Sequence, residues 1–154
     1  MNPDFLKQAI ELAVENIRRG GGPFAALVAK GDSVIATGAN RVTSDHDPTA
    51  HAEIVAIREA CRALGDFQLA GCDVYCSCEP CPMCLGAIYW ARPARVYFAA
   101  TQADAAEAGF DDSFIYKQIL LAPYDREIPM LRVVDEAATR PFEEWTGRVD
   151  KTEY

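Results

Sequence analysis

Two stretches of the sequence decide the fold. Asp47–Glu53 reads DPTAHAE and Glu79–Ala91 reads EPCPMCLGAIYWA. Each carries proline near its start, which predicts a helix beginning there, because the fixed φ of proline suits the first helical turn. Between them the apolar run Asp73–Cys78 predicts a strand. Helix, strand and helix in succession are typical of α/β proteins, in which helices cross between parallel strands.

The elements on either side agree with this class. Asn2-Pro3 predicts the start of a first helix, and the glycines at 20–22 predict its end. Further strands are predicted over Phe24–Lys30, Ser33–Gly38, Arg95–Ala100 and Met130–Val134, with a short helix within 103–119 and a last helix over Pro141–Val149. We therefore expect one domain, residues 1–154, folded as a three-layer αβα sandwich around a mixed sheet of about five strands.

Composition limits the classes of partner. The chain has 154 residues, half of them apolar, and a net charge of −8. An acidic surface repels phosphate backbones, and Arg18-Arg19 is the longest basic run, so we expect no nucleic-acid partner. No apolar run approaches the roughly 18 residues that span a bilayer, and the N-terminus lacks a secretion-signal pattern. We expect a cytoplasmic protein with no membrane partner.

The chemistry-bearing residues of the two deciding stretches are His51, Glu53, Cys81 and Cys84. One imidazole and two thiolates form a ligand set that suits zinc. Three protein ligands leave the fourth tetrahedral position open for water, which is typical of catalytic zinc sites. Two thiolates cancel the charge of the ion and weaken its effect on that water, so Glu53 is predicted to serve as a carboxylate base beside it.

Other interpretations of these cysteines remain open at this point. The C-x-x-C pair could be a redox pair, or the zinc could be structural, with Cys76, Cys78 or His46 as its fourth ligand. Cys61 and Cys72 are predicted to be small buried hydrophobic residues. A closed, four-ligand site would have no use for Glu53, which separates the structural interpretation from the catalytic one.

The H-x-E and P-C-x-x-C motifs together match the signature of zinc-dependent nucleobase deaminases. The chain therefore resembles the cytidine deaminase superfamily, and within it the bacterial guanine deaminases. The closer resemblance is carried by Gly22–Phe24, Asn40, Pro48–Glu53, Ser77–Ala91, Asp104–Lys117 and the final Glu153-Tyr154. It implies one Zn²⁺ per subunit and hydrolysis of guanine, a small-molecule purine base, to xanthine and ammonia.

The resemblance also implies roles for individual residues. Glu53 would move a proton from the attacking water to a ring nitrogen, and Asp112 would help to protonate the departing amine. Phe24 would stack on the purine, Asn40 would hydrogen-bond a ring edge, Trp90 would wall the pocket and Tyr154 would close it. A homodimer that exchanges its C-terminal segments is implied as well.

Several alternatives share the zinc motif. The chain could be a tRNA adenosine deaminase or a cytosine or cytidine deaminase of the same superfamily. Outside enzymes, it could be a zinc-stabilised structural module. The sequence does not decide how broad the substrate range is, and other amino-substituted heterocycles such as ammeline stay open.

Overall fold

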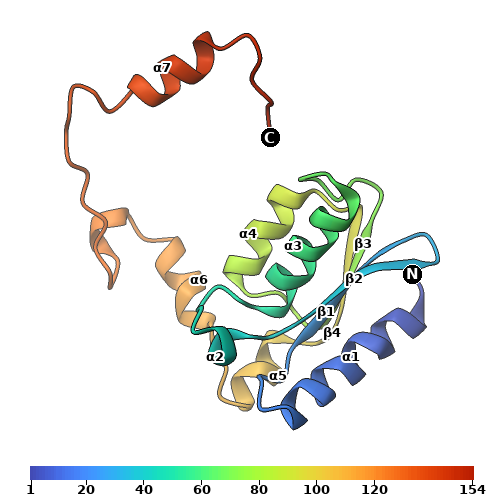
Figure 1. Cartoon of the computed structure of the whole chain (residues 1–154). Helices are drawn as coiled ribbons and strands as arrows, with labels where there is room; N and C mark the ends of the chain where they lie inside the picture. The colour runs from blue at the N-terminus through green and yellow to red at the C-terminus, as the bar shows by residue number, and fades with distance from the viewer. The chain divides into compact units, whose positions relative to one another are not determined.

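A four-stranded mixed sheet forms the centre of the fold (Figure 1). The computed structural model describes all 154 residues. The strands β1 (Ala25–Lys30), β2 (Ser33–Ala39), β3 (Asp73–Cys78) and β4 (Arg95–Ala100) lie in the order β2-β1-β3-β4. β1 runs antiparallel to both of its neighbours, and β3 runs parallel to β4.

Helices follow the strands as the α/β pattern predicts. They are α1 (Pro3–Arg18), α2 (Val42–Asp45), α3 (Ala52–Leu64), α4 (Pro82–Ala91), α5 (Gln102–Glu107), α6 (Ser113–Ile119), the 3₁₀ turn η1 (Pro123–Asp125) and α7 (Arg140–Gly147). Asn2 caps α1 by accepting a hydrogen bond from Asp4 N, and Gly65 ends α3 in the left-handed conformation. None of the helices is long and apolar enough to cross a membrane.

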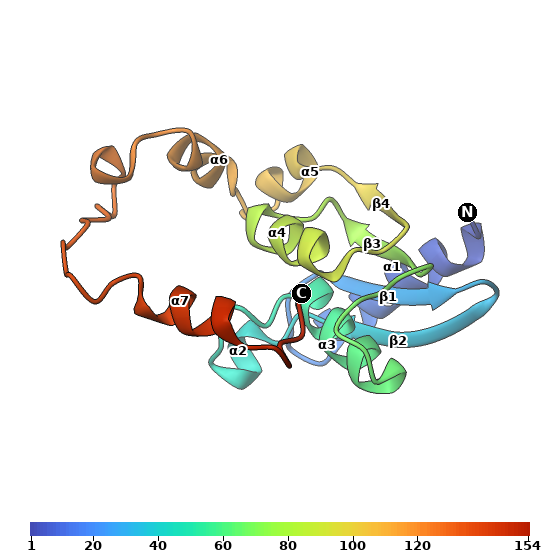
Figure 2. The ribbon, with the colours of Figure 1, turned by 90° about the horizontal axis from the view of Figure 1, so that it is seen from above.

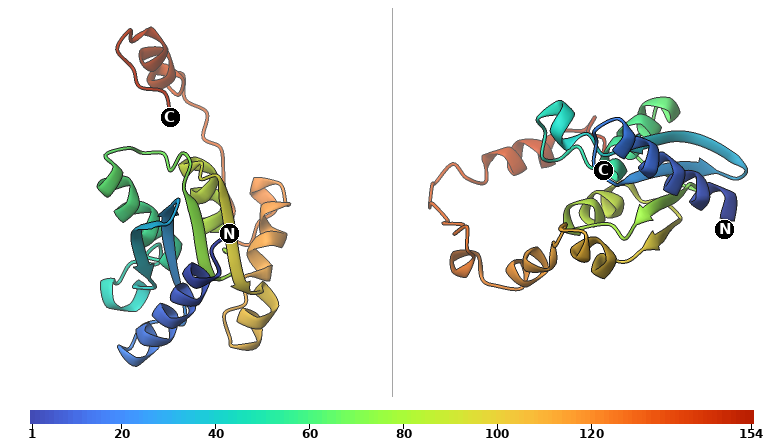
Figure 3. Two further views of the ribbon diagram at one scale, coloured as in Figure 1. Left: turned by 90° about the vertical axis from the view of Figure 1, so that its right-hand side faces the viewer. Right: turned by 90° about the horizontal axis from the view of Figure 1, so that it is seen from below.

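The two faces of the sheet pack against different helices, which confirms the three-layer sandwich (Figures 1 and 3). On one face Ala9 of α1 is buried among Leu27, Ala29 and Tyr75. On the other face the small residues of α3, Ala52, Ala56 and Ala60, pack on Ala26, Val28, Val74 and Cys76. Alternate residues of β1 point to opposite faces, so one strand serves both layers.

Gly38 in β2 sets how closely α3 approaches the sheet. A Cβ atom at this position would lie 2.2 Å from Ala52 O and 2.4 Å from Ala56 N. Both are backbone atoms of α3, which cannot rotate away as a side chain can. The first turn of α3 is therefore held directly against the sheet.

The chain divides into two compact units, Met1–Ser113 and Phe114–Tyr154. The second contains most of α6, together with η1 and α7. The prediction of a fifth strand at Met130–Val134 is wrong for the single chain. These residues form no strand, and Met130 N instead donates to Pro123 O at 2.9 Å. β-Branched residues favour extended backbone, but a strand also needs a neighbour to pair with.

Candidate active site

The site is built on the N-termini of α3 and α4, which pack against each other on one face of the sheet (Figures 1 and 2). The predicted helix starts were a few residues early. His51 and Cys81 are not inside the helices but at their N-caps, with extended φ, ψ of −66°, 155° and −64°, 169°. An N-cap side chain is free to reach past the helix end, so both can face the same point.

The ligand atoms of His51, Cys81 and Cys84 all lie within 4.8 Å of one another. His51 Nδ1 is 3.5 Å from Cys81 Sγ and 3.6 Å from Cys84 Sγ. A tetrahedral zinc ion at about 2.3 Å from sulfur and about 2.0 Å from nitrogen separates these atoms by about 3.5 Å. The three side chains therefore fit zinc in both donor type and spacing.

The thiols of Cys81 and Cys84 differ in how readily they lose their protons. Hydrogen bonds from Cys84 and His51 lower the pKa of Cys81 to about 4. The same pairing with Cys81, burial and the nearby Glu53 raise the pKa of Cys84. The pairing thus favours the thiolate at Cys81, the form that binds metal, whereas metal binding at Cys84 requires the loss of its proton.

Glu53 lies in the first turn of α3, only 8% exposed, with Oε2 3.4 Å from Cys84 Sγ. Burial raises its pKa, because a charged carboxylate is poorly solvated there. Glu53 is not one of the three clustered ligands, and neither are Cys76, Cys78 and His46. Three ligands with a buried carboxylate beside them form an open centre rather than a closed structural one.

Asp112 is held in place by Gln102, a residue that the sequence analysis missed. Gln102 Nε2 donates to Asp112 Oδ1 at 2.6 Å, and Gln102 N donates to Glu79 Oε2 at 3.0 Å. Glu79 precedes the Cys81 loop, so this chain of contacts ties Asp112 to the metal-binding loop. The pKa of His51 is raised by its hydrogen bond with Cys81 and, to a smaller extent, by the charges of Glu53 and Asp112. No sequence spacing links these three residues.

Phe24 and Asn40 lie side by side at the ends of β1 and β2. Asn40 N donates to Phe24 O at 3.0 Å, and the Phe24 ring meets Phe110 edge to face at 5.0 Å. Trp90 lies on α4 with 65% of its surface exposed, and the ring of Tyr154 meets Trp145 within the second unit. The binding roles expected of Trp90 and Tyr154 stay predictions.

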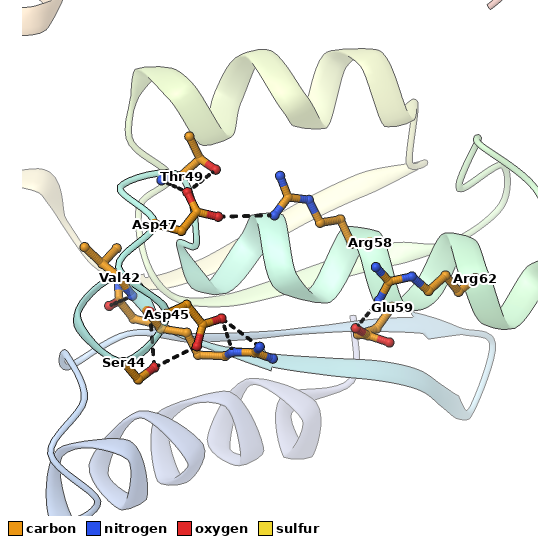
Figure 4. A network of polar contacts seen from close by, with 10 residues as sticks. Val42, Ser44, Asp45, Asp47, Thr49, Arg58, Glu59 and Arg62 are labelled. Atoms are coloured by element: carbon orange, nitrogen blue, oxygen red, sulfur yellow. Dashed lines mark hydrogen bonds and ion pairs between the residues drawn. The ribbon is translucent and has the colours of Figure 1, made fainter.

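A polar turn leads the chain into His51 (Figure 4). Asp47 Oδ1 accepts hydrogen bonds from Thr49 N at 2.8 Å and Thr49 Oγ1 at 2.7 Å. Its other carboxylate oxygen lies 3.8 Å from Arg58 of α3. Asp47-Pro48 therefore forms the turn that precedes α3. The hydrogen bonds with Thr49 stabilise the turn internally, and the contact with Arg58 connects it to α3.

Residues 2–100 match the model of the cytidine and deoxycytidylate deaminase zinc-binding region. The chain belongs to the cytidine and deoxycytidylate deaminase family. The match spans α3, α4 and all three candidate zinc ligands. The zinc centre of this family is therefore the one that His51, Cys81 and Cys84 build.

Relatives within the family differ in how much of the chain they match. Guanine deaminase of Bacillus subtilis is 55% identical over 151 residues, 97% of each protein. The crystal structure of guanine deaminase from Bacillus subtilis covers 100% of this chain and 99% of its own, with 54% identity and a TM-score of 0.98. The tRNA-specific adenosine deaminase of Aquifex aeolicus is 42% identical over 96 residues, 62% of this chain and 64% of that protein.

A further solved relative was determined in complex with 2,6-diaminopurine. It covers 70% of this chain and 61% of its own, with 38% identity and a TM-score of 0.68. This relative of the chain therefore binds a purine base.

Proposed function

We propose that the protein hydrolyses guanine to xanthine and ammonia. The observation that carries the proposal is the 55% identity to a guanine deaminase over 97% of both chains. The match to the tRNA deaminase of Aquifex aeolicus leaves more than a third of this chain uncovered. The shared zinc region alone does not choose a substrate, so the extent of the match favours guanine over a tRNA adenosine.

His51, Cys81 and Cys84 hold the zinc ion. When bound there, zinc supplies an acidified water as the nucleophile. Glu53 accepts the proton that this water loses and returns it to a ring nitrogen beside the attacked carbon. The raised pKa of the buried carboxylate suits this task, because it brings proton uptake and release closer to neutral pH.

Asp112 assists the departure of the amine. Gln102 occupies Oδ1 of this carboxylate, which leaves Oδ2 to face the leaving group. The remaining proton of the attacking water passes through this carboxylate to the amine, which leaves as ammonia. A carboxylate that is already held in place lowers the entropic part of the barrier to this transfer. Glu53 and Asp112 thus divide the two proton transfers between them.

The base is bound by groups around the hairpin and the helix ends. Phe24 stacks on the purine ring, with Phe110 supporting it from the side. Asn40 hydrogen-bonds a ring edge, Trp90 walls the pocket and Tyr154 closes it. The free-base substrate needs no basic surface, in keeping with the net charge of −8. Cysteine-rich zinc centres suit a reducing compartment, and we place the enzyme in the cytoplasm.

A homodimer with exchanged C-terminal segments completes the proposal, and residues 1–154 then form one deaminase domain. In the single chain, large apolar residues of the second unit are 76–86% exposed, namely Leu120, Ile128, Leu131, Val133 and Val134. Exposed apolar residues in this number favour a partner surface. A second copy of this chain supplies one, and pairing there would give Met130–Val134 the neighbour that a strand requires.

Ammonia release from guanine, guanosine, cytosine, cytidine and adenine tests the substrate. We expect guanine to be the preferred substrate of the zinc-loaded protein. Activity on a tRNA anticodon stem-loop with none on guanine would support adenosine deamination. Zinc at one per chain without any turnover would support a structural module.

Subunit mixing tests the exchange. A Glu53→Gln chain lacks the catalytic base but keeps an intact C-terminal tail. A chain that lacks Tyr154 keeps the base but has an incomplete tail. After co-refolding, exchanged tails restore activity to heterodimers. Tails that act within their own subunit leave the mixture no more active than its components.

A further inference from the structure

One amide of α1 ties together the two ends of the β1–β2 hairpin. Asn16, in the last turn of the helix, is half-buried. Its Nδ2 group donates to Gly22 O at 2.8 Å and to Asn40 O at 2.9 Å. These carbonyls lie just before β1 and just after β2. Both N–H groups of the Asn16 side-chain amide therefore donate to the segments that carry Phe24 and Asn40.

The glycines before β1 make room for this arrangement. A Cβ at Gly21 would lie 2.4 Å from Asn16 Nδ2, and one at Gly22 would lie 3.1 Å from Asn40 Oδ1. Neither glycine has a positive φ, so close packing rather than backbone freedom requires it. The backbone at Gly21 and Gly22 therefore packs directly against the side-chain amides of Asn16 and Asn40.

Asn40 itself is held at three points. Its N–H donates to Phe24 O at 3.0 Å, its C=O accepts from Asn16, and its Oδ1 accepts from Val42 N at 3.3 Å. The last contact decides which way the amide is turned, because a backbone N–H requires an acceptor opposite it. The Asn40 Nδ2 group makes no hydrogen bond within the protein and remains as a pair of donors.

We propose that Asn16 is a positioning residue that holds Asn40 so that its Nδ2 donors face an acceptor on the purine base. Guanine offers acceptors at O6 and N7. The inference rests on the proposed function, since it needs Asn40 to bind the base. Asn16 does not touch the substrate and acts through the Asn40 backbone.

Steady-state kinetics with guanine test this role. Asn16→Ala raises KM about tenfold, the equivalent of one well-placed hydrogen bond, and leaves kcat within about twofold. Asn16→Asp has the same shape without the N–H donors and gives the same increase. Gly21→Ala displaces the Asn16 amide and gives an increase in the same direction. Gln8→Ala, on the exposed side of the same helix, keeps the parent KM.

A double-mutant cycle separates positioning from general stability. In an Asn40→Ala background, Asn16→Ala changes KM by less than about twofold, because the group that it positions is gone. Equal increases in both backgrounds overturn the proposal and indicate an effect through the Phe24 segment. Zinc content stays at one per chain in every variant, and its loss in Asn16→Ala would overturn the proposal too.

The outcomes also distinguish this inference from the proposed function. If the parent releases no ammonia from guanine, both fall. If Asn40→Ala keeps the parent KM, the binding role of Asn40 and this inference fall, and hydrolysis of guanine stands. If Asn40→Ala raises KM while Asn16→Ala and Asn16→Asp do not, only the role of Asn16 falls.

Discussion

Replacing Gly38 by alanine tests how the sheet holds the active-site helix. The added Cβ meets Ala52 O at 2.2 Å and Ala56 N at 2.4 Å. Relief to ordinary contact moves α3 by about 1 Å away from β2, because packed carbon atoms prefer about 3.5 Å or more. His51 and Glu53 travel with the start of that helix, whereas Cys81 and Cys84 are carried by α4.

The magnitude follows from the two backbone clashes. Overpacking a core costs about 1–3 kcal/mol, and clashes with backbone lie at the upper end, so we expect a loss of about 3 kcal/mol. For a chain of this length that lowers Tm by about 6–12 °C. The shift of α3 also pulls one zinc ligand away from the other two, so zinc affinity falls together with stability.

Thermal unfolding of the zinc-loaded protein and a chelator competition measure the two effects. Gly86→Ala in α4 is the matched control, because a Cβ there meets nothing within 4 Å. The control should unfold at or slightly above the parent Tm, since alanine favours helix. A Gly38→Ala protein with the parent Tm and zinc affinity would refute the claim that α3 is seated directly on β2.

Four further predictions concern the centre itself. Glu53→Gln should keep one zinc per chain by metal analysis and lose about 100-fold or more of kcat, because an amide is no base; parent turnover would remove Glu53 from the mechanism. Cys81→Ser should lose zinc under a chelator that the parent withstands, since one of three ligands is gone; retained zinc would point to a different ligand set. Gln102→Leu should lower kcat and leave KM for guanine unchanged, because it frees Asp112 without touching the base; a change in KM alone would contradict this. Zinc affinity should fall by about tenfold or more per pH unit on acidification, measured by chelator competition at pH 6 and 7, because the ion displaces the proton on Cys84 and, since the pKa of His51 is raised, the imidazolium proton as well; pH-independent binding would show that no proton is released.

Local patterns were sufficient for most of the fold. The alternation of helices and short apolar strands predicted the α/β sandwich, and the structure confirms four of the strands and their helical crossovers. Helix starts were displaced by a few residues because Asp47-Pro48 forms a turn, which the hydrogen bonds of Thr49 stabilise. Met130–Val134 failed as a strand because propensity does not supply a neighbour to pair with.

The metal ligands could be named from the sequence because zinc selects donor type and local spacing, and both are visible in His51-Ala52-Glu53 and Cys81–Cys84. What only the tertiary structure decided is how these segments meet. His51 and Cys81 are 30 residues apart and come to 3.5 Å because two helices begin beside each other on one face of the sheet. The contacts of Asn16 with Asn40 and of Gln102 with Asp112 also arise only from packing, since no periodicity marks which distant backbone or carboxylate an amide will reach.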